Sequence, residues 1–376
     1  MKPAPSAPLD ARPVLWVRAR STRSVLDEHL RHVVGSFSAA GWSMVTDGPP
    51  DVPPGAAVAV MDDPWVEPLP RLALALARAR VPGSPLWRVP RVYGLSGRQG
   101  WRPAVPPSTM AEYERRTVRR GPARTVFLGD GAWTGFAVAA AGEGAALLRN
   151  GWPPRQAALV TNAFLYRYAD PSAHDRRELT PFVPAGARTV VDVGCGTGLL
   201  GSLLRHDGRR VVGIEPEWEL ARAARRNLDL VMPARAEEGL SAIRGPVDCI
   251  VFADVLEHTV APQQLLRVGA RLIGPAGRIV VSFPNAAWAP VLRGLASGRW
   301  DPTLAGVQAR DHLFYTTPRS FAAVAAECGL AVETLVPLGT AVSWRVRVWG
   351  LLAALTAGGK PSDTAASQWV AVLRTR

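Results

Sequence analysis

The feature that most constrains this chain is a glycine-rich turn that joins a short apolar strand to a helix-like stretch. Residues 189–193 form a β-branched run, and three glycines follow it at two-residue spacing, Gly194, Gly196 and Gly198. Glycine tolerates the positive φ of such a turn and lets the backbone approach a ligand closely. The N–H groups that open the next helix favour an anionic or polar group. This arrangement predicts a cradle for a nucleotide-like ligand.

An acid after the next predicted strand extends this pattern. Residues 211–214 form a second apolar run, and Glu215 follows it, 17 residues after Gly198. A carboxylate at this place can accept hydrogen bonds from both hydroxyls of a ribose. The alternative is that Glu215 caps the helix that begins near Pro216 and Glu217, where the helix dipole favours an acid. With the glycine turn beside it, the ribose-binding interpretation is preferred.

Apolar runs and helical spacings alternate from about residue 171 onward. The predicted strands of this region cover residues 189–193, 211–215, 247–252, 278–283, 331–336 and 368–373. The predicted helices between them cover residues 199–205, 217–228, 262–272 and 319–328. This alternation predicts an α/β fold with a doubly wound, mostly parallel sheet, whose ligand lies at the carboxyl ends of the strands. The two late strands predict an antiparallel addition at the end of the sheet.

The chain is long enough for two domains, since its 376 residues exceed one typical domain. We expect a flexible, proline-rich tail at residues 1–12 and a smaller accessory α/β domain of unknown role at residues 13–155. The alternating domain then covers residues 156–376. A helix at residues 157–168 is expected to lead into it.

One acidic pair in the first domain follows a predicted strand at residues 56–61. Asp62 and Asp63 resemble the metal-binding acid pairs of nucleotide-sugar glycosyltransferases. A helix-capping turn explains the same residues, because short acidic side chains are preferred at such caps. The capping turn is the preferred interpretation, since no other glycosyltransferase feature is clear in the sequence.

The composition limits the partners that this chain is expected to have. A formal charge of +13 first suggests nucleic acid, but the many arginines are scattered in short pairs, so a nucleic-acid partner is not expected. The three cysteines, Cys195, Cys249 and Cys328, lie far apart and form no CxxC, so we expect no metal site and a reducing, cytoplasmic location. No apolar run reaches the length of a membrane span. The stretch from Trp344 to Leu355 comes nearest and is predicted to be an amphipathic helix.

The glycine turn differs in detail from the dinucleotide GxGxxG pattern. It reads Val-Asp-Val-Gly-Cys-Gly-Thr-Gly, with Asp192 before the first glycine and the third glycine two positions after the second. These features resemble motif I of the class I S-adenosylmethionine-dependent methyltransferases. The resemblance implies a Rossmann-like seven-stranded sheet, S-adenosyl-L-methionine as the cofactor, and Glu215 as the acid that binds its ribose.

A second segment, residues 248–258, resembles the segment after strand four in the ubiquinone-biosynthesis O-methyltransferases. Residues 291–316 look like a bacterial subfamily often found beside glycosyltransferases, and the resemblance covers about residues 166–376. It implies adenine contact near Ala236, although Arg235 stands where the family often has an acid. The resemblance assigns cofactor binding to Asp192, Gly194, Cys195, Gly196, Gly198, Glu215, Pro216, Ala236, Glu237, Ala253, Asp254 and Val255.

Methyl transfer to an oxygen needs a group that accepts the proton of the acceptor, and an imidazole suits neutral pH. His258 and His312 are the candidates, because both are expected at the carboxyl edge of the sheet, although either could be a structural histidine. Residues 285–317 are expected to form a lid-like insertion whose aromatic side chains suit sugars or flat rings. We expect O-methylation of a small molecule or saccharide, with a homodimer as one assembly. The alternatives are methylation of RNA or another macromolecule, and a non-catalytic, cofactor-binding partner protein.

Overall fold

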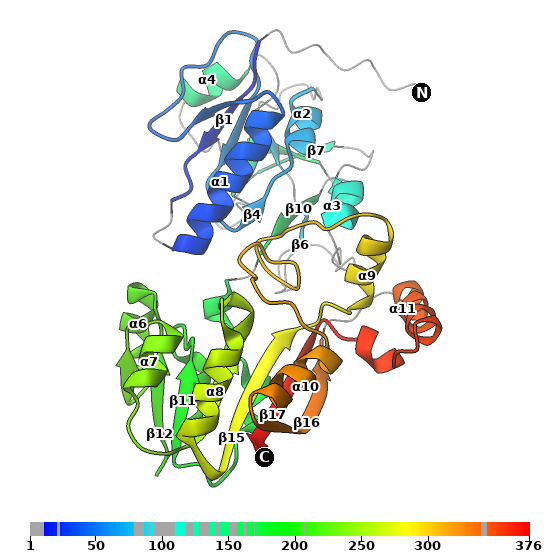
Figure 1. The fold of residues 1–376 in the computed structure, drawn as a ribbon. Helices are drawn as coiled ribbons and strands as arrows, with labels where there is room; N and C mark the ends of the chain where they lie inside the picture. Colours follow the sequence, from blue (N-terminus) through cyan, green and yellow to red (C-terminus); the bar gives the residue numbers. More distant parts are fainter. Residues whose placement is uncertain are drawn as a thin grey trace. The chain divides into compact units, whose positions relative to one another are not determined.

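The computed structural model divides into two compact units, residues 1–169 and 170–376, and each is described by itself. Figure 1 shows the elements of both units. The structure describes residues 11–20, 23–78, 86–88, 91–93, 110–117, 123–127, 135–139, 143–149, 156–160, 164–168, 170–206, 208–339 and 344–376. Most of the expected N-terminal tail therefore lies outside the described residues. Within them, no helix combines the length and the apolar character needed to cross a bilayer.

The first unit contains a mixed seven-stranded sheet in the order β2-β1-β3-β8-β5-β9-β7 and a three-stranded sheet in the order β4-β10-β6. Its strands are β1 (Val14–Val17), β2 (Ser43–Val45), β3 (Val58–Met61), β4 (Val66–Glu67), β5 (Leu86–Arg88), β6 (Arg91–Tyr93), β7 (Ala123–Phe127), β8 (Phe136–Ala139), β9 (Gln156–Val160) and β10 (Phe164–Arg167). Its helices are α1 (Ser24–Ala39), α2 (Pro70–Arg78), α3 (Met110–Thr117) and α4 (Gly144–Arg149).

The connecting helix expected at residues 157–168 is wrong, because its described residues, apart from Tyr168, lie in two strands. β9 pairs with β5 and β7, and β10 pairs with β4 and β6. These strands tie the segment to the first unit, so the division falls after residue 169 and not after residue 155. A short apolar run does not distinguish a buried strand from a buried helix by its periodicity, which explains the error.

The second unit has the expected seven-stranded α/β sheet, in the order β13-β12-β11-β14-β15-β17-β16. Its strands are β11 (Thr189–Val193), β12 (Arg210–Ile214), β13 (Leu230–Met232), β14 (Val247–Ala253), β15 (Ile273–Pro284), β16 (Leu330–Leu338) and β17 (Gln368–Thr375). β17 runs antiparallel to both of its neighbours, and the other pairings are parallel. The predicted antiparallel addition is therefore confirmed.

Helices cover both faces of this sheet, so its central strands are apolar on both sides. The helices are α5 (Leu199–Leu204), α6 (Trp218–Ala224), α7 (Ala236–Ala242), α8 (Pro262–Leu272), α9 (Ala289–Ala296), α10 (Pro318–Glu327) and α11 (Trp344–Thr356). Val191 of β11 packs with Leu265 of α8 and Phe321 of α10 in one core cluster. Val190, one residue earlier, packs with Leu200 of α5 on the opposite face. This alternation is what a doubly wound sheet requires.

Three further elements went unpredicted in the second unit: β13, α7 and α9. The first two follow the expected helix at residues 217–228, which the structure ends at Ala224. β13 is only three residues long and pairs at the edge of the sheet with β12. Such a short edge strand leaves little periodicity in the sequence.

Replacement of Phe252 by alanine tests this core. Phe252 lies in the central strand β14 and is fully buried. Because the substitution removes apolar contacts and leaves a cavity, we expect the free energy of unfolding of the second unit to fall by about 3–5 kcal/mol. Urea denaturation followed by circular dichroism measures the loss. Leu230→Ala, at an exposed position of β13, is the control and should cost no more than about 0.5 kcal/mol. Equal urea midpoints for both variants would contradict the described packing.

Candidate functional site

The glycine turn lies between β11 and α5, and all three of its glycines have positive φ. The φ angles are 67° at Gly194, 54° at Gly196 and 79° at Gly198. At Gly194 an added Cβ would lie 2.6 Å from Cγ2 of Val255. The backbone N–H of Gly194 donates to the carbonyl of Ile214, 2.8 Å away, which fixes the turn against β12. A side chain at these positions would therefore strain or block the turn.

Glu215 connects this turn with the start of α6. Its Oε2 accepts a hydrogen bond of 2.9 Å from the N–H of Gly196, and its Oε1 accepts one of 2.9 Å from the N–H of Glu217. The capping alternative is therefore present in the structure. It does not exclude ribose binding, because a carboxylate oxygen can accept more than one hydrogen bond. Glu215 is buried, at 6% exposure, directly beside the turn.

Asp192 lies beneath the turn and is almost completely buried. Burial and the nearby charge of Glu215 raise the pKa of Asp192 to about 7, although the N–H of Gly201 donates to it. Among the described residues, its Oδ2 has no hydrogen-bond partner. Of the other predicted cofactor residues, Cys195 is buried, Pro216 is exposed, and Ala236, Glu237, Ala253, Asp254 and Val255 are half-buried.

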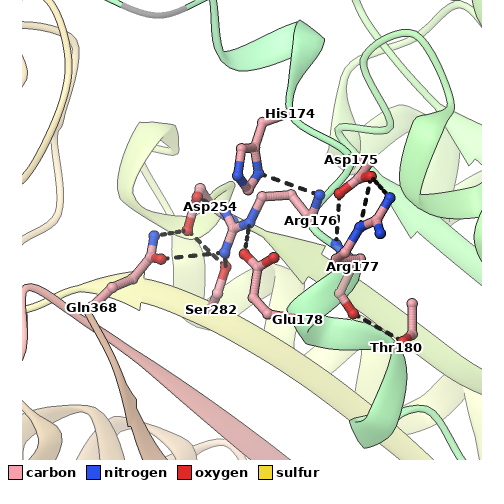
Figure 2. Close-up of polar contacts among 9 residues, drawn as sticks. All are labelled: His174, Asp175, Arg176, Arg177, Glu178, Thr180, Asp254, Ser282 and Gln368. Atoms are coloured by element: carbon pink, nitrogen blue, oxygen red, sulfur yellow. Dashed lines mark hydrogen bonds and ion pairs between the residues drawn. The ribbon is translucent and has the colours of Figure 1, made fainter. Parts of the chain in front are cut away.

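A polar network at the carboxyl ends of β14 and β15 went unpredicted in the sequence, apart from Asp254 (Figure 2). Arg176, which precedes the short helix η2 (Arg177–Phe182), forms an ion pair with Asp254. The Arg176 guanidinium also donates to Oγ of Ser282 at 3.2 Å and to Oε1 of Gln368 at 3.3 Å. Oδ1 of Asp254 accepts from Ser282 and from Gln368, each at 2.7 Å. Segments as far as 192 residues apart thus meet at one carboxylate.

The backbone of this network is strained at the two residues that carry its charges. Among the described residues, Arg176, with φ of 50°, and Asp254, with φ of 57°, are the non-glycine residues in the left-handed region. Such conformations cost about 1–3 kcal/mol each and cluster at ligand sites, where the surrounding structure maintains them. The side chain of Arg176 is only 13% exposed, so its charge is held close to Asp254.

The two predicted histidines come together although they lie in different segments. Their ring centroids are 4.8 Å apart with an interplanar angle of 77°. Nδ1 of His258 lies 3.2 Å from Oδ2 of Asp311. Nδ1 of His312 lies 3.2 Å from the carbonyl of Val307. Because a carbonyl only accepts, this Nδ1 carries a proton, and the neutral ring of His312 then presents an unprotonated Nε2.

The surroundings shift the pKa values of the two histidines in opposite directions. Burial disfavours protonation of His258, but the hydrogen bond to Asp311 and the charges of Glu257 and Asp311 outweigh it and raise the His258 pKa. Burial and the charge of His258 lower the pKa of His312 to about 4. At neutral pH, the ring of His312 is therefore uncharged. Pairs of titratable groups driven apart in this way are typical of acid–base sites.

The side chain of Glu257 lies close to the two histidines. Ligand atoms of Glu257, His258 and His312 all lie within 4.8 Å of one another, so this group could hold a metal ion. Burial raises the pKa of Glu257 to about 7, and its Oε2 has no hydrogen-bond partner among the described residues. The expectation of no metal site, which rested on cysteine spacing, stays a prediction.

The aromatic residues of the expected insertion at residues 285–317 have different places. Trp288 is buried and packs with Val291 and Val307. Trp300 and Tyr315 are partly exposed and contact each other edge to face, with centroids 5.1 Å apart. Tyr315 in turn lies 6.0 Å from the ring of His312. Tyr315 is therefore the aromatic residue of this segment that contacts the histidine pair, through His312, and Trp288 is core.

The acidic pair of the first unit is engaged in local contacts. Oδ1 of Asp62 pairs with Arg18 at 3.1 Å. Oδ1 of Asp63 accepts the N–H of Trp65 at 2.9 Å, and its Oδ2 pairs with Arg167 at 2.6 Å. The contact from Asp63 to an N–H two residues later is an Asx turn. This turn leads into β4 and not into a helix, so the expectation that the pair caps a helix is wrong.

Replacement of Asp311 by asparagine tests how the histidine pair is held. The substitution removes the carboxylate that favours the protonated ring, so we expect the pKa of His258 to fall. NMR titration of histidine-labelled protein measures the change. The matched variant Asp301→Asn, whose carboxylate pairs with Arg299, should leave both histidines unchanged. A His258 pKa that is the same in Asp311→Asn and in the unaltered protein would contradict the ion pair.

Comparison with known proteins gives a match that begins at the end of the first unit and covers most of the second. Residues 163–335 match a family model described as a methyltransferase domain. The chain is 29% identical over 157 residues to a ubiquinone biosynthesis O-methyltransferase of Xylella fastidiosa, and the match covers 40% of this chain and 64% of that protein. It is 33% identical over 108 residues to the enzyme of the same name from Caulobacter vibrioides, covering 27% of this chain and 43% of that protein. The chain thus spans less than two thirds of the length of either relative.

Among solved structures, the chain is similar to an S-adenosylmethionine-dependent methyltransferase from Archaeoglobus fulgidus. The TM-score is 0.38 at 16% identity, over 53% of this chain and 90% of that one. A second similar structure is an O-methyltransferase from neocarzinostatin biosynthesis, with a TM-score of 0.36 at 18% identity, over 54% of this chain and 53% of that one.

The family match includes the residues that the sheet brings together at the site. The family match begins at residue 163 and ends at residue 335, so it includes the glycine turn, Glu215, Asp254 and both histidines. The sheet places the turn and the acid on its neighbouring strands β11 and β12. Residues 163–335 therefore match a methyltransferase domain, and within them the glycine turn and the acid lie on neighbouring strands, as the family resemblance implies.

Proposed function

We propose that this protein is an S-adenosylmethionine-dependent O-methyltransferase that acts on a small molecule or a saccharide. The observation that carries the proposal is the buried Glu215, which is bound to the N–H groups of Gly196 and Glu217 at the carboxyl ends of β11 and β12. This is where a doubly wound sheet binds its ligand. The O-methyltransferase names of the curated relatives support oxygen as the methylated atom.

The residues of the site fit the separate parts of S-adenosyl-L-methionine. The left-handed turn at Gly194 carries no side chain, so the donor could approach its backbone closely. Glu215 would accept the ribose hydroxyls, and the start of α7 at Ala236 and Glu237 would lie against the adenine. The amino-acid end of the donor carries one carboxylate and one ammonium group.

Arg176 and Asp254 match these two charges. We assign the carboxylate of the donor to the Arg176 guanidinium and its ammonium group to Asp254. Both residues are already held in place, Asp254 by Ser282 and Gln368, and Arg176 additionally by Glu178 at 2.7 Å. Donor binding would replace the ion pair between Arg176 and Asp254 with one ion pair from each residue to the ligand. Because both side chains are already partly removed from water in the fold, binding adds little to the cost of desolvating them. This makes Arg176 a cofactor residue that the sequence motifs did not indicate.

When bound, S-adenosyl-L-methionine supplies a methyl group that its sulfonium activates for displacement. The chain must then align an oxygen acceptor and take up its proton. We assign this role to Nε2 of His312, because its Nδ1 is committed to the carbonyl of Val307 and Nε2 is left as the acceptor. Asp311 holds His258 beside it, and Tyr315 and Trp300 would contact the acceptor with their ring faces or edges. Aromatic side chains at this place suit a flat ring or a sugar.

Replacement of Glu215 by glutamine tests the ribose contact. The amide keeps the size of the side chain but loses its charge and turns one acceptor into a donor, so we expect the affinity for S-adenosyl-L-methionine to fall roughly 10- to 100-fold. Isothermal titration calorimetry measures the dissociation constant. Glu219→Gln, at an exposed position of α6, is the matched control. An unchanged dissociation constant for Glu215→Gln would remove the basis of the proposed function.

Replacement of Arg176 by methionine separates the two ends of the donor. The variant should bind S-adenosylhomocysteine roughly 10- to 100-fold more weakly, because it lacks the charge that pairs with the carboxylate. Binding of methylthioadenosine, which has no amino-acid carboxylate, should stay the same, and calorimetry with both ligands shows the difference. Arg177→Met is the matched control, since the neighbouring Arg177 is exposed and pairs with Asp175. Equal losses for both ligands would show that Arg176 acts on the fold and not on the carboxylate.

A further inference from the structure

Helix α11 (Trp344–Thr356) presents its large apolar side chains to solvent. In Figure 1 it lies at the edge of the second unit, next to α9. The exposed side chains and their exposed fractions are Trp344 (69%), Val348 (44%), Leu351 (39%), Leu352 (57%) and Leu355 (57%). A contiguous set of this kind is unusual on the surface of a monomeric domain and marks an interaction site.

The side of α11 that faces the domain is lined with small residues. Gly350 and Ala354 are buried. A Cβ on Gly350 would lie 2.6 Å from Cβ of Ala289 in α9 and 3.1 Å from Oγ1 of Thr364. This close approach fixes which face of the helix points inward. The exposure of the large side chains is therefore a consequence of how α11 is seated. The prediction of an amphipathic helix is wrong, because small apolar residues line the inward face and large apolar residues the outward face.

The exposed side chains form one stripe along the helix. Their positions, 344, 348, 351, 352 and 355, follow the spacing of residues on one face of an α-helix. Arg345 and Arg347 are both exposed and lie on the two flanks of this stripe, at about 100° per residue. The helix contains no acidic residue. Long arginine side chains beside an apolar face can extend to a polar surface while the apolar residues are buried.

We propose that α11 is an interfacial helix that docks the protein onto the surface of an anionic phospholipid bilayer. The apolar stripe would enter the boundary between headgroups and acyl chains, and Arg345 and Arg347 would contact the phosphates. The formal charge of +13 on the whole chain favours the same surface. A second copy on this face is less favourable, because a two-fold interface would bring the four arginines of two basic helices together without an acid of α11 to pair with them. Surface docking needs no spanning helix.

Co-sedimentation of the full chain with lipid vesicles tests the proposal. We expect binding to vesicles of equal parts phosphatidylglycerol and phosphatidylcholine, and much weaker binding to phosphatidylcholine alone. The double variant Leu352→Glu, Leu355→Glu should lower the partition coefficient by about tenfold or more, since it places charges in the apolar stripe. Replacement of Arg345 and Arg347 by glutamine should lower it by roughly fivefold for each arginine.

Matched variants elsewhere on the second unit control for exposure and charge. Leu203→Glu, on α5 at 45% exposure, and Arg244→Gln should bind vesicles as the unaltered protein does. The affinity of the α11 variants for S-adenosylhomocysteine should be unchanged, so the test does not depend on the proposed enzymatic function. Absence of binding to anionic vesicles, or equal binding by the α11 variants, overturns the proposal. So does a dimer that the α11 variants dissociate while vesicle binding is absent, because the occupant is then a second copy.

Discussion

The hydrogen bonds of Glu215 hold the donor side of the site together. One carboxylate oxygen accepts from the glycine turn and the other from the start of α6, so two segments that follow neighbouring strands share one buried acid. The turn adopts its left-handed shape only because glycine occupies positions 194, 196 and 198. Loss of the charge at this acid would therefore affect both the ligand contact and the shape of the turn.

The opposite side of the site depends on a strained ion pair. Arg176 and Asp254 both occupy the left-handed region, and Ser282 and Gln368 maintain Asp254 there through hydrogen bonds. The contacts that maintain this conformation come from β15 and β17, which pair with each other in the sheet. A paired cation and anion, already removed from bulk water, suit a ligand whose end carries the same two charges.

The two histidines acquire different chemistry from their surroundings. His258 and His312 have the same side chain, but Asp311 and Glu257 favour the charged form of the first, while burial and the neighbouring charge favour the neutral form of the second. Their roles follow from the way the insertion folds back, because the N–H of Leu313 donates to the carbonyl of Glu257 at 2.7 Å. This contact brings Asp311 and His312 to the end of β14.

The sequence by itself determined the local parts: β11, the glycine turn, the acid after β12 and the alternation of the second unit, because glycine chemistry and apolar periodicity act over a few residues. The helix predicted at residues 157–168 was wrong, because a short buried strand and a short buried helix have similar apolar patterns in the sequence. Only the tertiary structure decided which distant residues meet. The Arg176–Gln368 contact spans 192 residues, and the histidine pair spans 54. Such contacts depend on the order of the strands and on where each segment returns to the edge of the sheet. Neither can be predicted from the spacing of residues within a short segment.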